Sequence, residues 1–426
     1  MVRGNQNHLT GDCMSGAKSI RSDVCKDSFH EMKYLLIIIA IFLLIMPTCA
    51  SDLPQFPDIE GESAILTDAV TGQVLYYKNA DVRRPMASTT KIMTAILVIE
   101  NCDMDEIVIA SKKASEAPYT SLHLQPGEEV TVGDLLKALL IRSANDTAVA
   151  LAEHVGGTVD GFVKMMNDKA KEIGANDTHF VTPNGLYVPN HYTTARDLAL
   201  ITRYALKLPI FNEVICCQSA RIDRSINTQD VLVQSKSKFL KNYPGADGVK
   251  SGYIKEAGYC YVGSATRNGW RLVSVVLKSN DSQADTAVLM DYGFSNYEQL
   301  TLAECDKPIE AIDVPGGSGK LNLVPSDKLQ VSVKTGEQDK ARTEIKLDDL
   351  HAPIRKGDKV GTITAYVGDT RIVSADLLAA NDVDESLASL VWPWGKSIGL
   401  LSMLSIGVLC GRTTAKSNGR RRSRLS

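Results

Sequence analysis

Residues 83–95, RRPMASTTKIMTA, place a serine and a lysine one helical turn apart at the start of an apolar run. Residues three positions apart lie on one face of a helix, so the Lys91 amine can approach the Ser88 hydroxyl. Burial disfavours the charged form of a lysine and leaves a neutral amine that can accept a proton. Ser88 and Lys91 are therefore a candidate nucleophile and its base.

The Ser-x-x-Lys spacing alone is not specific, because the chain also contains it at residues 15–18 and 235–238. The first copy precedes a candidate secretion signal, and the second lies in a polar stretch with the pattern of a strand. Only Ser88 opens an apolar stretch with helical periodicity, residues 89–100. This context distinguishes Ser88 from the other two serines.

Two further polar motifs follow along the chain. Ser143-Ala144-Asn145 lies between two expected helices, where it can present side chains to a cleft, although Asn145 can equally serve as a helix cap. Lys250-Ser251-Gly252 lies in an expected strand, where alternation sends its lysine and glycine to one face and its serine to the other. Each motif has a second copy, at residues 225–227 and 334–336, and the later copy has the character of a turn.

Helices are expected in the middle of the chain. Thr131 and Asp134 have the spacing of a capping box at the start of an apolar helix. The next helix begins at a capping Asn145 or Asp146 and ends at the glycines of residues 156–157, and another helix, residues 162–173, stops at a glycine. These patterns predict a set of short packed helices.

Strands are expected on both sides of these helices. Residues 64–67 and 73–77 read as two strands, and Asn268-Gly269 between the alternating stretches 259–267 and 270–278 predicts a hairpin beside a strand over 249–253. Strands at both ends with helices between them indicate one antiparallel sheet flanked by helices, an α+β fold. Short alternating stretches over residues 305–383 predict a small all-β domain.

The ordered set of Ser-x-x-Lys, Ser-x-Asn and Lys-Ser-Gly is the signature of penicillin-binding proteins and serine β-lactamases. Beyond these motifs, the chain resembles the D-alanyl-D-alanine carboxypeptidases in PMASTTKIMTA, LLKALLIRSANDTAVALAEHVGG, FVTPNGL, HYTTARDLALI, GADGVKSGYIKEAGYC and MDYGF. The stretch APIRKGDKVGTITAYVGDTRIVSADLLA resembles their C-terminal β domain. The resemblance implies a penicillin-binding protein/β-lactamase-like fold, with the carboxypeptidase domain over residues 51–300.

The resemblance also implies an activity, the removal of the terminal D-alanine from peptidoglycan stem pentapeptides through an acyl-enzyme, with inhibition by β-lactams. The implied catalytic residues are Ser88, Lys91 and Ser143, and the implied substrate-binding residues are Asn145, Lys250, Ser251, Gly252 and Tyr253.

Each of these residues has an implied role. Ser88 attacks the carbonyl between the two D-alanines, Lys91 takes its proton, and Ser143 relays a proton to the departing D-alanine. Asn145 holds the substrate amide, while Lys250 and the Ser251 hydroxyl receive the terminal carboxylate. The oxyanion lies between the backbone N–H groups of Ser88 and Tyr253.

The chain departs from the family pattern at two places. Ser251 stands where threonine is usual, which keeps the hydroxyl and loses only a methyl group. Many members also carry an arginine about a dozen residues before the glycine-phenylalanine pair seen here at residues 293–294, but this region reads NDSQADTAV. Lys278 or Arg267 would have to supply that positive charge.

Three rival functions use much of the same sequence. A class A β-lactamase needs a Glu-x-x-Leu-Asn string, which is absent between Asn145 and Lys250. An endopeptidase that cuts D-alanyl cross-links uses the same residues, so the sequence leaves both peptidase activities open. A wall-binding scaffold without turnover is disfavoured because all three motifs are intact.

Composition excludes several partners. The chain has 426 residues, 44% of them hydrophobic and 23% charged, and its net charge of −3 argues against nucleic acid as a partner. None of the 9 cysteines shows the close spacing of a zinc site, so we expect no metal and no other cofactor.

The two termini point to export and to the membrane. Residues 32–50 have the charge, apolar core and small cleavage-site residues of a signal peptide, and the polar residues 1–31 are an extension or a mis-called start. Residues 391–411 are expected to form a membrane anchor, followed by the basic tail of residues 412–426. These features predict an enzyme at the outer face of the bacterial cytoplasmic membrane, anchored at its C-terminus.

Overall fold

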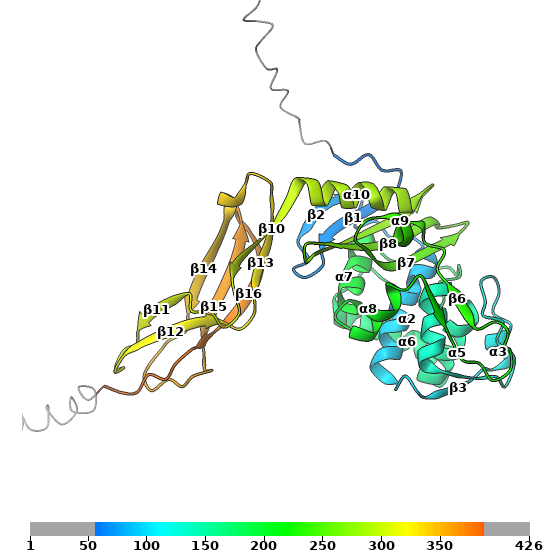
Figure 1. Cartoon of the computed structure of the whole chain (residues 1–426), viewed down its shortest axis with the longest axis horizontal. Coiled ribbons are helices and arrows are strands. Elements are labelled where there is room, and N and C mark those ends of the chain that lie inside the picture. Colours follow the sequence, from blue (N-terminus) through cyan, green and yellow to red (C-terminus); the bar gives the residue numbers. More distant parts are fainter. Residues whose placement is uncertain (1–55, 387–426) are drawn as a thin grey trace, which may run out of the picture. The chain divides into compact units, whose positions relative to one another are not determined.

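The computed structural model describes residues 56–386 (Figure 1). The expected extension, signal peptide, membrane anchor and basic tail, residues 1–31, 32–50, 391–411 and 412–426, lie outside these residues. Within residues 56–386, no helix combines the length and the apolar character that crossing a bilayer requires.

An antiparallel sheet of five strands forms the centre of the larger group of elements, in the order β2-β1-β9-β8-β7. Its strands are β1 (Ser63–Asp68), β2 (Val74–Lys78), β7 (Ala246–Ile254), β8 (Gly258–Arg267) and β9 (Trp270–Ser279). The expected hairpin is confirmed: Asn268 and Gly269 connect β8 to β9 with φ of 52° and 80°, the left-handed conformation that a two-residue type I′ turn needs. The strand expected over 249–253 is also confirmed as part of β7.

Helices cover both faces of this sheet (Figure 1). Alternation along the strands divides their apolar side chains, because successive residues point to opposite faces. Leu66, Leu272 and Val276 belong to the apolar cluster that includes residues of α9 (Lys238–Asn242) and α10 (Ser282–Asn296). Their neighbours Ile65, Val273, Val275 and Leu277 belong to the large cluster that α2, α5, α6, α7 and α8 share.

The helical elements lie mostly between β2 and β7 in the sequence. They are the 3₁₀ helix η1 (Ala87–Thr90), the π-helix η2 (Ala138–Arg142) and the α-helices α2 (Lys91–Asn101), α3 (Lys112–Ser115), α4 (Val132–Lys137), α5 (Asn145–Gly156), α6 (Val159–Ile173), α7 (Ala195–Ala205) and α8 (Pro209–Ile215). Two small hairpins accompany them, β3 (Ile107–Ile109) with β4 (Glu129–Thr131) and β5 (Ser219–Arg221) with β6 (Leu232–Gln234).

Most of the expected helix ends are confirmed. The Thr131 hydroxyl accepts the Asp134 N–H at the start of α4, and α5 and α6 end against Gly157 and Gly174, both with positive φ. The expected cap at Asn145 or Asp146 is wrong. Ala144 is the N-cap residue of α5 and Asn145 is the first helical residue, because the Asn145 side chain makes other contacts, described below.

The second group of elements is all β, apart from the short 3₁₀ helix η3 (Gln338–Lys340). One sheet has the order β11-β12-β16-β15-β14, and β10 pairs with β13 in another. The strands are β10 (Tyr297–Ala303), β11 (Glu310–Asp313), β12 (Lys320–Pro325), β13 (Leu329–Lys334), β14 (Ala341–Leu347), β15 (Lys359–Val367) and β16 (Thr370–Ala379), around a core of their own. Lys334-Thr335-Gly336 is the expected turn, and Gly336 has φ of 85°. The predicted α+β fold with a small all-β part is therefore confirmed.

A buried ion pair joins the loop between β5 and β6 to the segment before β4. Arg224 and Glu128 are both fully buried, and Arg224 Nε and Nη2 donate to the two carboxylate oxygens at 2.7 and 2.9 Å. Arg224 also donates to the backbone carbonyls of Leu122 and His123. Since each polar atom of the pair is satisfied in this way, the removal of one partner leaves a buried charge uncompensated.

We predict that Arg224→Met lowers the free energy of unfolding by about 3–5 kcal/mol, because Glu128 then remains buried without its cation. Arg196→Met is the matched control: its partner Asp81 is 66% exposed in the side chain, and loss of such a surface pair costs less than about 1 kcal/mol. Urea denaturation of both variants measures the difference. An equal loss of unfolding free energy in the two variants would show that the buried Arg224 pair contributes no more to stability than the exposed pair.

Candidate active site

Ser88 and Lys91 lie side by side where the short helix η1 runs into α2. Lys91 is completely buried, and its Nζ donates to Ser88 Oγ at 2.9 Å. The same nitrogen donates to Asn145 Oδ1 at 2.7 Å and to the backbone carbonyl of Asn184 at 2.8 Å. Three segments far apart in the sequence therefore meet at one amine.

The three neighbours of Lys91 differ in one chemical respect. The Asn145 Oδ1 and Asn184 carbonyl oxygens can only accept hydrogen bonds, whereas the Ser88 hydroxyl can also donate. A neutral amine keeps two N–H donors and one lone pair. With its two donors directed at the two amide oxygens, its lone pair faces the one neighbour that has a proton to give, which is Ser88.

The surroundings of Lys91 favour this neutral form. Burial, followed by the repulsion of the Lys250 charge, holds the pKa of Lys91 well below the 10.5 of an ordinary lysine, while the Asp146 carboxylate opposes part of this shift. Lys250 itself is 3% exposed, and burial lowers its pKa to about 7. Two buried lysines therefore share one site, and each is far easier to deprotonate than a lysine in water.

Strand β7 brings the Lys-Ser-Gly motif next to Ser88. A Cβ on Gly252 would lie 2.8 Å from the Ser88 backbone nitrogen and 3.0 Å from the Ala87 Cβ, so only glycine allows this approach. The Lys250 side chain is buried and its Nζ donates to the Ser251 carbonyl at 3.2 Å, while Ser251 is half-buried. Since β7 is an edge strand of the sheet, an extended peptide can lie along it.

Tyr253 continues the same strand beyond the glycine. Its side chain is 58% exposed, and its ring lies 4.5 Å from that of Tyr259 on β8, measured between centroids. The pair forms an exposed aromatic surface next to the motif.

Ser143 lies at the end of the π-helix η2 in the left-handed conformation, with φ of 67°. A residue other than glycine is uncommon there, and such strained positions concentrate at functional sites. Ser143 precedes Asn145 by two residues and is half-buried. Within residues 56–386 its hydroxyl makes no hydrogen bond, so its assignment rests on its place in the chain.

Asn145 is held by the protein at both ends of its amide. Its Oδ1 accepts from Lys91, and its Nδ2 donates to the Pro118 carbonyl at 2.7 Å. The backbone N–H of Asn145 donates to the Thr120 carbonyl at 2.7 Å. These contacts fix the orientation of the Asn145 amide, so its oxygen points at the lysine.

Asn184 is the site residue that motif analysis did not single out, although it lies in the stretch FVTPNGL. The loop that carries it is fixed next to η1: Thr94 Oγ1 donates to the Pro183 carbonyl at 2.6 Å, and Gly185 has φ of 84°. A Cβ on Gly185 would lie 1.9 Å from the Ala87 carbonyl oxygen. The glycine after Asn184 was the available signal, because it permits this close contact.

His191 supports the same loop from behind. Its Nδ1 accepts the Val181 N–H at 2.9 Å, and its Nε2 lies 2.9 Å from Thr90 Oγ1. Burial, and then the neighbouring His179, lower the pKa of His191 to about 4, so it is neutral at physiological pH. A neutral imidazole can accept at one nitrogen and donate at the other, which matches these two partners.

The two basic residues proposed to replace the missing arginine have other partners. Lys278 Nζ lies 2.8 Å from a Glu62 carboxylate oxygen, and Arg267 contacts Asp291 and Tyr243. In the stretch NDSQADTAV, near where the family arginine usually stands, Asp285 of α10 accepts hydrogen bonds from the backbone N–H groups of Glu60 and Gly61. Both candidate replacements are therefore already paired with a carboxylate.

Comparison with known proteins gives a consistent result along the chain. The sequence model of the D-alanyl-D-alanine carboxypeptidases (peptidase S11) matches residues 50–281, and that of the C-terminal domain of penicillin-binding protein 5 matches residues 297–385. The chain is 34% identical over 338 residues to the D-alanyl-D-alanine carboxypeptidase DacF of Bacillus subtilis, a match that covers 77% of this chain and 87% of DacF.

Two further relatives agree. The D-alanyl-D-alanine carboxypeptidase DacC of Escherichia coli is 30% identical over 366 residues, which are 81% of this chain and 90% of DacC. Among solved structures, penicillin-binding protein 5 of Haemophilus influenzae superposes with a TM-score of 0.68 at 28% identity, over 78% of this chain and 99% of that one.

We predict that Lys250→Met stabilises the free protein in a pH-dependent way. In the wild type the lysine has a pKa of about 7 when folded and near 10.5 when unfolded, so between these values the unfolded state binds more protons and stability rises with pH. Methionine keeps most of the length of the side chain without the charge. The Tm of the variant therefore exceeds that of the wild type by the full amount below pH 7, and this difference shrinks toward pH 10.5. A difference that does not change with pH contradicts a lowered pKa of Lys250.

Proposed function

The chain belongs to the D-alanyl-D-alanine carboxypeptidase family of serine hydrolases, the S11 penicillin-binding proteins, and from that premise we propose that Ser88 is its acylated nucleophile. The substrate is a peptidoglycan stem pentapeptide and the product is the tetrapeptide with free D-alanine. The observation that carries this proposal is the 2.9 Å contact between Ser88 Oγ and a buried Lys91 whose other two neighbours only accept hydrogen bonds.

Acylation begins with proton transfer from Ser88 to the neutral Lys91 amine. Ser88 Oγ then attacks the carbonyl carbon between the two D-alanines, and charge develops on the carbonyl oxygen. The backbone N–H groups of Ser88 and Tyr253 receive that charge, with Ser88 close to the positive N-terminal end of α2. The close approach of Gly252 to Ser88 supports this arrangement, because it holds β7 against the nucleophile.

The remaining residues bind the substrate and release the product. Lys250 and the Ser251 hydroxyl receive the terminal carboxylate, and the bound carboxylate keeps Lys250 protonated. Asn145 positions Lys91 and faces the substrate amide, and Ser143 relays the proton from Lys91 to the departing D-alanine. Water then hydrolyses the acyl-enzyme, which needs no cofactor.

β-Lactams inhibit by the same route, because their strained amide resembles the D-alanyl-D-alanine bond and reacts with Ser88. Export through the signal peptide of residues 32–50 and anchoring through residues 391–411 are part of this proposal, which places the enzyme at the outer face of the cytoplasmic membrane. Their support is the sequence alone.

We predict that a fluorescent penicillin labels the wild type and not Ser88→Ala. Ser235→Ala is the matched control, since Ser235 heads another Ser-x-x-Lys in the chain, and it should label normally. Incubation with a stem pentapeptide should release D-alanine in the wild type and the control only. Label on Ser88→Ala would show that the nucleophile is misassigned. Cleavage of a cross-linked peptide dimer into monomers, without release of D-alanine from the pentapeptide, would show an endopeptidase, and labelling without turnover of either substrate a binding scaffold.

We further predict that Lys91→Arg abolishes labelling while the protein remains folded, as judged by circular dichroism. Arginine keeps N–H donors at this position, but it does not lose its proton at any physiological pH and so provides no base. Labelling of Lys91→Arg at a rate near that of the wild type would rule out Lys91 as the base.

A further inference from the structure

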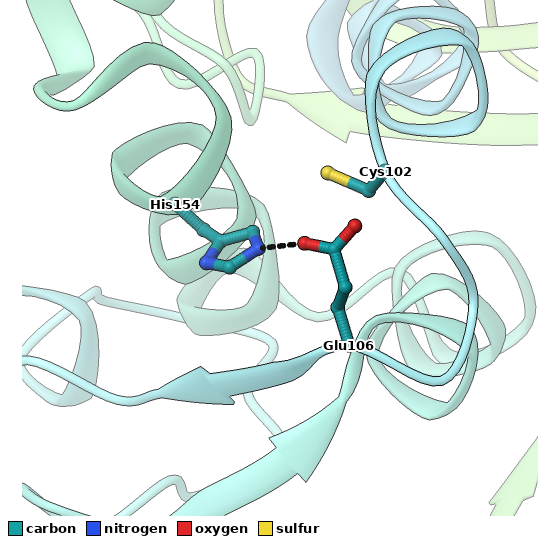
Figure 2. Close-up of side chains that lie close together, drawn as sticks. All are labelled: Cys102, Glu106 and His154. Atoms are coloured by element: carbon teal, nitrogen blue, oxygen red, sulfur yellow. Dashed lines mark hydrogen bonds and ion pairs between the residues drawn. The ribbon is translucent and has the colours of Figure 1, made fainter.

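Three side chains of types that can bind a metal ion converge on one side of the helical region, away from the Ser88 site. Figure 2 shows Cys102, Glu106 and His154 pointing toward one another from the end of α2, the segment before β3 and the last turn of α5. Their ligand atoms all lie within 4.8 Å of one another. His154 Nε2 and Glu106 Oε2 are 3.1 Å apart.

The backbone orients the Glu106 side chain and fixes the main chain at Cys102. Glu106 Oε1 accepts the backbone N–H of Asp103 at 2.7 Å, which turns its other oxygen toward His154. Cys102 is the C-cap residue of α2, and its N–H donates to the Val98 carbonyl. Contacts of this kind orient metal ligands in known sites.

The local charge favours a cation. Cys102 caps the C-terminus of α2 and His154 lies in the last turn of α5, so both side chains lie at the negative ends of helix dipoles. The connecting segment adds the exposed carboxylates of Asp103 and Asp105 to that of Glu106. The helix dipoles and the carboxylates thus both favour a bound cation.

We propose that Cys102, Glu106 and His154 bind one divalent transition-metal ion, and that zinc fits best. Zinc–ligand bonds of about 2.0–2.3 Å place tetrahedral ligand atoms roughly 3.3–3.8 Å apart. The histidine and glutamate atoms are already about this close, and the sulfur reaches the same spacing by a shift on the order of 1 Å. Water supplies the fourth ligand, because two of the three side chains are exposed.

The ligand set also sets the selectivity. A thiolate and an imidazole favour zinc over magnesium and calcium, which prefer oxygen ligands. The sequence predicts no metal site, because the ligands come from three separate elements and lack the close cysteine spacing of zinc motifs.

The position of this site assigns it a structural role. Lys91 begins α2 and Asn145 begins α5, whereas Cys102 and His154 lie at the opposite ends of the same two helices. Eleven residues of α2 separate the sites by roughly 16 Å of helix. A bound ion therefore ties the far ends of the two helices that carry the catalytic lysine and its asparagine partner, without touching the reaction.

Cobalt titration tests the proposal, since a cobalt–thiolate bond gives a charge-transfer band in the near ultraviolet. The full chain, stripped with a chelator, should bind one equivalent of Co²⁺ with this band, and Zn²⁺ should displace it. Cys102→Ser should abolish the band, and His154→Gln, which removes a ligand, should weaken binding by more than the roughly tenfold to hundredfold that loss of a ligand's hydrogen-bond partner costs. The controls Cys216→Ser and His351→Gln, at an exposed cysteine and an exposed histidine elsewhere, should bind as the wild type does.

Penicillin labelling of each variant reports on folding and keeps this proposal separate from the proposed function. Cys102→Ser that labels normally and binds no cobalt supports the metal site. A band of equal strength in Cys102→Ser, or no saturable band in the wild type, overturns it. If Cys102→Ser does not label, the effect of Zn²⁺ on the Tm of the wild type decides. A rise in Tm that is absent from His154→Gln supports the site. No rise in the wild type refutes it.

Discussion

The hydrogen bonds of one buried amine hold the active site together. Lys91 has no exposed surface, and it meets Ser88 in the adjoining helix η1, Asn145 at the start of α5 and Asn184 in a distant loop. Because a buried polar group must be satisfied, these contacts constrain how the three segments pack. They also leave the lone pair of the neutral amine facing the one neighbour that can donate. The packing constraint and the proposed base catalysis therefore have the same origin.

The site keeps this arrangement at a cost in stability. Lys91 and Lys250 are both buried, and each has a lowered pKa because the protein interior disfavours its charge. Ser143 adds a left-handed backbone conformation that residues other than glycine rarely adopt. Features of this kind persist only where the surrounding packing enforces them, here the helices and sheet whose apolar side chains form the large core cluster.

The sequence predicted what local patterns determine. The β8–β9 hairpin follows from an asparagine-glycine pair between alternating strands, and the helix ends at Gly157 and Gly174 follow from the conformational freedom of glycine. The three motifs predicted Ser88, Lys91 and Lys250 as site residues from local patterns too, and their roles stay predictions. Asn145 was misread as a possible helix cap, because its real partners, Lys91 and Pro118, lie far away in the sequence. Asn184 and the cluster of Cys102, Glu106 and His154 depend wholly on such long-range contacts, which no single stretch reveals.

Base catalysis by Lys91 requires that its amine is neutral before the substrate arrives. Nitrogen NMR of the lysine side chains across a pH titration tests it directly, with the Lys91 signal assigned by its loss in Lys91→Arg. We expect that Lys91 Nζ in the free enzyme loses its proton well below the pH of 10.5 at which an ordinary lysine does so. A Lys91 signal that remains that of an ammonium up to pH 10.5 would rule out a neutral Lys91 in the free enzyme.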